Sequence, residues 1–184
     1  MYRSKSNPHL VLRPQDLVVL LRLSLERDSA PAYAALGEEL GLTASEVHAG
    51  LERATLAQLA RKDKAGKPAV VREALWLYVQ HGARYSFPAT RGEVTRGLPT
   101  GYAAAPLKDK IVQPNDPPPV WPYKNGTVRG TAFYPLYPTV PGAAMRNPAL
   151  YELLALFDAV RGGSPRERAI ALELLKERLA HESE

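Results

Sequence analysis

The chain has 184 residues, of which 45% are hydrophobic, a size and composition typical of one domain or of one small domain with an extension. It contains no cysteine, which excludes disulfide bonds and thiolate metal sites. The formal net charge of +5 is a mild excess that does not by itself indicate a nucleic-acid partner. The N-terminal residues show no apolar run before Pro8, and no stretch is long enough to span a membrane. We therefore expect a cytoplasmic protein without a signal peptide.

Positive charge and proline are both concentrated in the middle of the chain. Residues 83–130 hold seven Lys and Arg against three Asp and Glu, whereas the flanking segments are nearly balanced. Twelve of the 17 prolines cluster from Pro88 to Pro148, and because proline breaks helices, this part is not expected to be mostly helical. The sequence therefore predicts two domains, residues 1–82 and residues 83–184.

The first domain is predicted to begin with three helices. Residues 1–13 are expected to form an arm, followed by a helix from Pro14 to about Arg27, since proline suits the first helical position. Its apolar face follows helical spacing and consists of Leu17, Leu20, Leu21 and Leu25. After a break at residues 28–31, the second helix spans about Ala32 to Leu40 and the third spans Ala44 to about Leu59.

The segment from Leu36 to Ala54 has the pattern of a helix-turn-helix. Gly37 places a minimal side chain where the two helices approach, and Gly41 suits the left-handed conformation that ends the second helix. Thr43 and Glu46 form a capping box at the start of the third helix. The inward stripe of that helix is Val47, Leu51 and Ala54.

This segment resembles the helix-turn-helix of bacterial winged-helix transcriptional regulators, the MarR-like group, over roughly residues 14–70. The resemblance implies a sequence-specific binder of double-stranded DNA that acts as a homodimer and docks its recognition helix, residues 43–54, in the major groove. Small helical hairpins with glycine turns also occur in proteins that do not bind DNA, which is the alternative for this motif.

The candidate DNA contacts lie on the face of the third helix opposite the apolar stripe. Ser45 and His48 are candidates for base edges or phosphates, Ala49 for a thymine methyl group, and Arg53 for a bidentate contact with guanine. Glu52 can accept a hydrogen bond from cytosine but repels phosphate. With the capping residue, the predicted set is Thr43, Ser45, His48, Ala49, Glu52 and Arg53. A solvated helix face is the alternative.

A basic loop follows the third helix. Its cations are Arg61, Lys62, Lys64 and Lys67, arranged around Gly66, and they are predicted to contact DNA phosphates. The apolar flank, residues 69–71, is short and alternates poorly, so the sequence departs here from a full two-stranded wing. The alternative is a solvated charged loop.

A largely buried helix from Val71 to His81 is predicted to close the first domain. The second domain is predicted from weaker signals, and its residues 84–107 are expected to be an ordered irregular connection. Asn125 and Gly126 predict a β-hairpin with strands at 119–124 and 127–134.

Two helices are predicted at the end of the chain, at about 148–161 and from Ser164 to about His181. Their apolar stripes serve either a homodimer interface or the cover of the hairpin within one chain.

No catalytic or cofactor motif is present. The histidines at 9, 48, 81 and 181 lack metal-ligand spacing, and no nucleotide-binding glycine motif is found. We therefore expect a mainly α fold with a small β component, no cofactor, no metal and no enzymatic activity. The predicted function is a DNA-binding transcriptional regulator. The alternative is an antitoxin-like or adaptor protein whose C-terminal part binds a partner protein and whose helix-turn-helix serves autoregulation.

Overall fold

The computed structural model describes residues 11–26 and 30–180. Residues 1–10 of the predicted arm, and His181 at the predicted end of the last helix, lie outside the described residues. The expectation of a mainly helical protein with a small β component is confirmed. The first half contains α1 (Pro14–Leu23), α2 (Tyr33–Leu40), α3 (Ala44–Leu56), β1 (Ala60–Lys62), β2 (Pro68–Val70), α4 (Arg72–His81) and α5 (Ala83–Ser86). The second half contains β3 (Arg91–Pro99), β4 (Pro119–Pro122), β5 (Val128–Phe133), α6 (Val140–Arg146), α7 (Pro148–Gly162) and α8 (Pro165–Ala180), with short 3-10 turns at Gly101–Ala103 and Leu107–Asp109.

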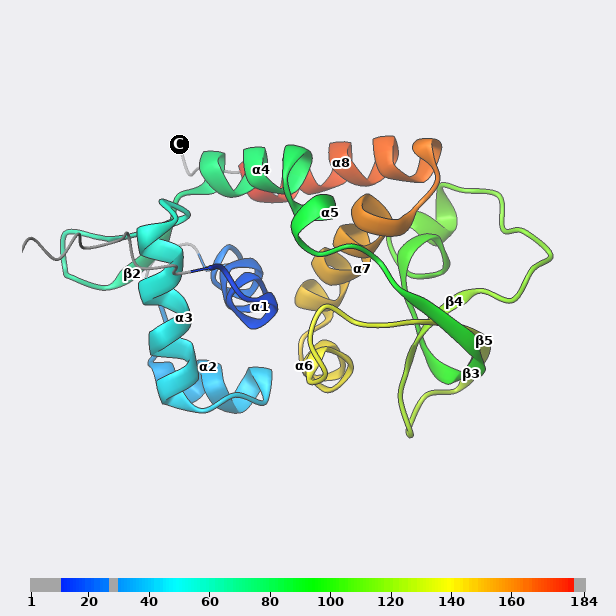
Figure 1. Ribbon diagram of the computed structural model, residues 1–184, viewed down its shortest axis with the longest axis horizontal. Coiled ribbons are helices and arrows are strands. Elements are labelled where there is room, and N and C mark those ends of the chain that lie inside the picture. The colour runs from blue at the N-terminus through cyan, green and yellow to red at the C-terminus, as the bar shows by residue number, and fades with distance from the viewer. Residues whose placement is uncertain (1–10, 27–29, 181–184) are drawn as a thin grey trace, which may run out of the picture.

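The elements are arranged along one long axis. Helices α1 to α3 and the β1–β2 pair lie at one end, and β3, β4 and β5 lie at the other (Figure 1). Helix α7 lies between the two ends, and α4 and α8 run side by side over the top of the molecule. Apolar residues of both halves, among them Leu20, Leu75 and Phe157, belong to one buried cluster. The predicted halves 1–82 and 83–184 therefore share a hydrophobic core.

The starts of the helices follow local rules that the sequence makes visible. Pro14 occupies the first position of α1. At α3, the Oγ1 of Thr43 accepts a hydrogen bond from the Glu46 amide at 3.1 Å, and the Thr43 amide donates to Glu46 at 2.8 Å, which confirms the capping box. Gly41 ends α2 with φ +68°, and a Cβ on Gly37 would lie 2.6 Å from the Leu42 carbonyl oxygen. Both glycines therefore serve the purposes predicted for them.

Helix α4 is less buried than its composition suggests. Only Leu75 and Val79 of this helix are buried, while Leu77 is 49% exposed. The expectation of a largely buried helix is wrong because α4 lies at the surface, with α8 beside it (Figure 1).

The two strands predicted within 119–134 are present as β4 and β5, but their predicted pairing as a hairpin is wrong. Strands β4 and β5 pair in parallel, with Pro119 opposite Thr131, and both run antiparallel to β3 in a three-stranded closed barrel. A Cβ on Gly126 would lie 2.4 Å from the Cα of Gly97, so Gly126 allows two backbones to touch and does not form a two-residue hairpin turn. Residues 84–107, expected to be irregular, supply the nine-residue strand β3 that organises this barrel.

The two C-terminal helices are present, and their apolar stripes are buried within the chain. Asn147 caps α7 by accepting a hydrogen bond from the Leu150 amide at 3.0 Å. Leu153, Phe157 and Leu175 are at most 1% exposed. The stripes predicted to serve either a dimer or the cover of the β-strands thus pack inside one chain. Helix α6, which the sequence analysis did not predict, precedes α7.

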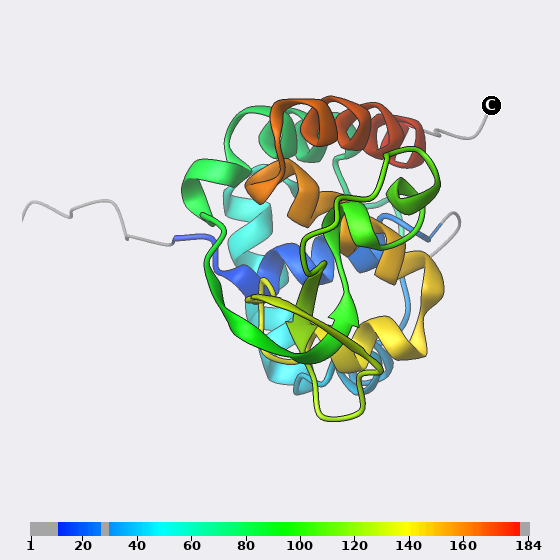
Figure 2. The ribbon, with the colours of Figure 1, turned by 90° about the vertical axis from the view of Figure 1, so that its right-hand side faces the viewer.

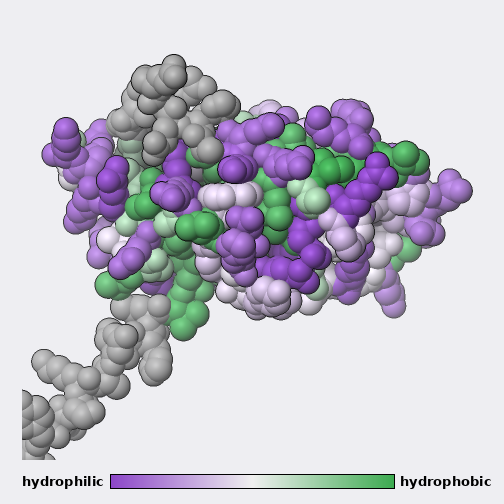
Figure 3. All heavy atoms as spheres, turned by 90° about the horizontal axis from the view of Figure 1, so that it is seen from above, coloured by the Kyte–Doolittle hydropathy of each residue, from purple (hydrophilic) through white to green (hydrophobic). Residues whose placement is uncertain are grey.

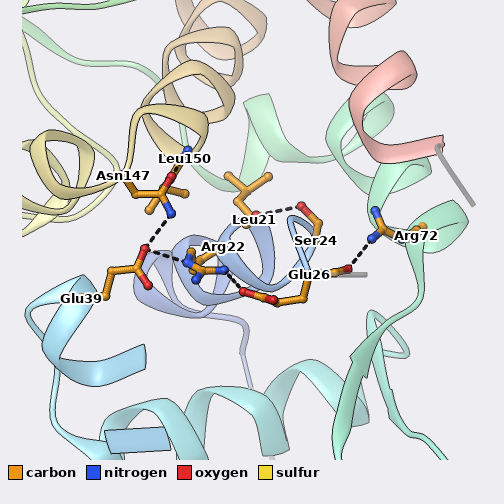
Figure 4. A network of polar contacts seen from close by, with 8 residues as sticks. All are labelled: Leu21, Arg22, Ser24, Glu26, Glu39, Arg72, Asn147 and Leu150. Atoms are coloured by element: carbon orange, nitrogen blue, oxygen red, sulfur yellow. Dashed lines mark hydrogen bonds and ion pairs between the residues drawn. The ribbon is translucent and has the colours of Figure 1, made fainter. Parts of the chain in front are cut away.

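A polar network fastens α2 to its neighbours (Figure 4). Glu39 accepts hydrogen bonds at 2.7 Å from Arg22 of α1 and from Asn147 at the start of α7. On the other side of α1, Arg72 donates to the Glu26 carbonyl at 2.9 Å. Burial of Glu39 opposes ionisation, but the hydrogen bonds from Arg22 and Asn147 outweigh it and lower the pKa of Glu39. The position of α2 is therefore set by both halves of the chain.

Candidate nucleic-acid interface

Helix α3 is held against α1 by apolar contacts and by one buried ion pair. Val47, Leu51 and Ala54 are buried as predicted. The carboxylate of Asp16 in α1 is fully buried and accepts two hydrogen bonds from Arg53 of α3, each 2.7 Å long. These contacts fix the rotation of α3 about its own axis, and they therefore decide which residues face outward.

The position of Gly50 shows how closely α1 and α3 approach. A Cβ at this position would lie 2.8 Å from the Asp16 carboxylate oxygen. The same carboxylate accepts the Arg13 amide at 2.8 Å, so Asp16 ties the start of α1 to α3. Sequence reasoning missed Asp16, although an aspartate at the third position of a helix is a recognisable capping signal.

The placement of Arg53 contradicts its predicted role as a base reader. Its side chain is 12% exposed, and its Nε and Nη2 atoms are both committed to Asp16. The hydrogen bonds with Asp16 raise the pKa of Arg53 above its ordinary value. Arg53 was expected to face outward because it is polar and lies off the main apolar stripe, but a buried carboxylate 37 residues away draws it inward.

The other predicted residues of α3 lie at or near the outer face. Ser45, His48 and Glu52 are exposed, as is the capping residue Thr43, whereas Ala49 is half-buried. The His48 ring lies 5.5 Å from the ring of Tyr33 at the start of α2, so its position is defined by an aromatic contact. The structure thus brings Ser45, His48 and Glu52 together on one exposed surface.

The basic loop forms a short, ordered β-hairpin. Strands β1 and β2 are antiparallel, with Ala60 opposite Val70. Between them, Asp63 accepts hydrogen bonds at 2.8 Å from the amides of Ala65 and Lys67, and Gly66 adopts φ +77°. The side chains of Arg61, Lys62, Lys64 and Lys67 are all exposed. The two-stranded form that the flanking sequence left open is therefore present.

The hairpin and α2 enclose a shallow hollow of about 330 Å³. Tyr33 and Pro31 line it on the side of α2, and Gly66, Lys67 and Pro68 line it on the side of the hairpin. Because Tyr33 also contacts His48, this hollow lies beside the outer face of α3, and Lys67 is the hairpin cation that lines it.

The two parts of the candidate interface carry opposite charge. Helices α2 and α3 together hold four glutamates and one arginine, and that arginine is the one paired with Asp16. The hairpin, residues 60–70, holds four cations and one aspartate. Attraction for a polyanion therefore comes from the hairpin, while α3 offers hydroxyl, imidazole and carboxylate groups that suit short-range recognition.

The described residues contain no group of three side chains arranged to hold a metal ion, and no helix among them has the length and apolarity needed to cross a membrane. Compared with known proteins, the chain matches no family model, no curated protein and no solved structure. What the interface binds must therefore be inferred from its geometry and charge.

Proposed function

We propose that the protein binds double-stranded DNA through a winged helix-turn-helix made of α2, α3 and the β1–β2 hairpin. The observation that carries the proposal is the capped, outward-facing α3 followed directly by an ordered hairpin with four exposed cations. In this arrangement the helix enters the major groove and the hairpin contacts the phosphate backbone. A cytoplasmic transcriptional regulator is the corresponding cellular role.

The contacts are divided between the two elements. Arg61, Lys62, Lys64 and Lys67 of the hairpin provide sequence-independent affinity that falls with added salt. Ser45 and His48 provide recognition of base edges, and Glu52 restricts it, because a carboxylate tolerates cytosine but repels a nearby phosphate. A homodimer that reads two half-sites uses surfaces other than the buried stripes of α7 and α8.

The upper face of the molecule is one such surface. Helix α4 lies on this side of the molecule (Figure 1), and its residues Glu73, Leu77 and His81, spaced four apart, are all exposed. Seen from above, apolar residues are interspersed with hydrophilic ones on this face (Figure 3). A dimer formed through it has a mixed, partly polar interface.

The test is fluorescence anisotropy with a duplex from the chain's own upstream region and a scrambled duplex. The variant Lys62→Ala/Lys64→Ala is expected to weaken binding to both duplexes about equally and to lower the slope of log affinity against log salt by about 2. The matched control, Arg166→Ala/Lys176→Ala, removes two exposed cations of α8 and is expected to change neither. Ser45→Ala/His48→Ala is expected to reduce the preference for the native duplex. Unchanged affinity in the hairpin variant would contradict the proposal.

A second candidate function is favoured by one observation. The exposed face of α3 carries Glu52 and Leu56, and Leu56 is 63% exposed. The described residues of this face include no lysine or arginine that lacks an ion-pair partner. Such a face suits a protein partner, as in an antitoxin-like or adaptor protein. Binding of a co-purified protein that is lost in Leu56→Ser, without any change in duplex affinity, would favour this candidate.

A further inference from the structure

Two arginines face each other across neighbouring strands at the end of the molecule away from α3. Arg96 of β3 lies directly opposite Arg129 of β5 in an antiparallel pair. Side chains at such positions lie on the same face of the sheet, with Cβ atoms about 5 Å apart. Both residues are exposed. Like charges in this relation repel, so the pair costs stability in the free protein.

Nothing in the described part of the chain compensates these charges. Neither guanidinium group forms an ion pair or side-chain hydrogen bond there, and the two border a hollow of about 310 Å³ with Val94, Thr95 and Thr127. No carboxylate lines that hollow. By contrast, Arg91 of the same strand donates to the Gly162 carbonyl at 2.9 Å and lies over the Phe133 ring. The side chain of Arg91 thus has a structural role, whereas the side chains of Arg96 and Arg129 form no such contact in the described part of the chain.

The chemistry of the hollow fits a phosphate. Two adjacent guanidinium groups form charge-assisted, bidentate hydrogen bonds with phosphate oxygens, and the hydroxyl groups of Thr95 and Thr127 add further donors. Lys124, in the turn that connects β4 and β5, is also exposed and adds positive charge nearby. Duplex DNA, with one charge per roughly 1.7 Å of its axis, presents neighbouring phosphates to such a surface.

The position of the pair separates it from the proposed winged helix-turn-helix. The β1–β2 hairpin and the β3–β5 barrel lie at opposite ends of the long axis (Figure 1), and turning the molecule brings the barrel to the front (Figure 2). A straight duplex bound along the hairpin and α3 runs at the far end of the molecule from Arg96 and Arg129.

We infer that Arg96 and Arg129 form a second DNA-backbone site, so that one chain holds two duplex segments at once. This inference rests on the proposed function for its first segment. We expect this second contact to be independent of base sequence. The charged groups that line the hollow, Arg96 and Arg129, are suited to phosphate, and both lie on strands and not on a helix that could enter a DNA groove.

The test measures how many short, mixed-sequence duplexes one chain binds, by stoichiometric titration of a fluorescent duplex. It also measures whether the protein recruits that duplex to beads that carry a second, immobilised duplex. The wild type is expected to bind two duplexes per chain and to bridge. Arg96→Ala/Arg129→Ala is expected to bind one and to lose bridging, while Arg166→Ala/Lys176→Ala behaves as wild type. Circular dichroism of each variant verifies that it is folded.

The outcomes separate the two proposals. A wild type that binds one duplex, with no change in Arg96→Ala/Arg129→Ala, overturns the second site and leaves the winged helix-turn-helix intact. If Arg96→Ala/Arg129→Ala loses all binding while Lys62→Ala/Lys64→Ala binds as the wild type does, the arginine site is supported. The same result overturns the hairpin as the primary interface. A wild type that binds no duplex overturns both.

Discussion

The two ends of the molecule are each held by a buried aspartate–arginine pair, but the pairs do different work. Asp16 and Arg53 belong to different helices and fix α3 against α1. Asp158 and Arg161 both belong to α7, and their hydrogen bonds connect this helix to the β-strands and the segments next to them. Asp158 accepts hydrogen bonds from Trp121 of β4 at 2.6 Å and from Thr100 at 2.8 Å, while Arg161 donates to the Tyr134 carbonyl at 2.7 Å. The first pair orients a helix, and the second anchors the β-strands to a helix.

The environments of the two pairs also differ. The Arg161 side chain is 4% exposed and lies over the ring of Phe133, whereas Arg53 is 12% exposed. Burial raises the pKa of Asp158 even though Arg161, Thr100 and Trp121 all favour its charged form. Charge burial is therefore more complete at the C-terminal pair, and losing one partner there is expected to cost more.

The largest expected effect comes from Arg161→Met, which leaves Asp158 buried without its cation. We expect a loss of about 3–5 kcal/mol in the free energy of unfolding, measured by urea denaturation. The double variant Asp158→Asn/Arg161→Met is the control, because it removes both charges and should recover part of that loss. If the double variant is no more stable than the single one, the lost contribution is packing and not charge.

An intermediate effect is expected for Arg53→Met in the N-terminal pair. Asp16 keeps its hydrogen bond from the Arg13 amide, so we expect a loss of about 2–3 kcal/mol. Because Arg53 faces inward and the buried Val47, Leu51 and Ala54 still hold α3 in place, the folded variant should retain the preference for native over scrambled duplex. A variant of normal stability that has lost this preference would show that Arg53 reads DNA after leaving Asp16.

The smallest effect concerns the brace between α2 and α7, and it depends on pH. Since the pKa of Glu39 is lowered in the folded protein, its stabilising contribution is present above the ordinary value of 4.5 and is lost as the pH falls through the folded value. Glu39→Gln is expected to cost about 1 kcal/mol at neutral pH, a difference that shrinks on acidification. Urea unfolding of both proteins at neutral and acidic pH measures it. If the difference in unfolding free energy between wild type and Glu39→Gln did not depend on pH, the loss would come from the altered hydrogen-bond geometry of the glutamine side chain and not from the charge of Glu39.

The pH dependence of the stability contributed by Asp158 has the opposite sign to that of Glu39. Its pKa is raised in the folded state, so its contribution to stability is greatest below its ordinary value of 3.8 and is lost as the pH rises through the folded value. The two carboxyl groups are therefore expected to change stability with pH in opposite directions, and the pH dependence of Glu39→Gln reports on Glu39 alone.

Local patterns predicted the N-terminal half well. The capping box at Thr43, the left-handed Gly41 and the start of α1 at Pro14 all depend on residues within a few positions of each other. The candidate site was predicted less completely. Ser45, His48 and the hairpin cations are exposed as expected, but Arg53 was placed on the wrong side because its partner, Asp16, is distant in sequence.

The middle of the chain shows why local signals fail there. Asn125 and Gly126 carry the usual hairpin signal, yet β4 and β5 are parallel because both pair with β3. Position 126 requires glycine because it contacts the backbone of Gly97. Hydrophobic periodicity and turn preferences carry no information about such a contact between distant residues.

The sequence by itself determined the longer helices, the caps at Pro14, Gly41 and Thr43, and the run of cations after α3, because these depend on neighbouring residues. Only the tertiary structure decided which polar side chains remain available. It committed Arg53 to Asp16 and Arg161 to Asp158, and it left Arg96 opposite Arg129 without a partner among the described residues. The physical reason is that burial and ion pairing join residues far apart in the chain, whereas helix periodicity and capping do not.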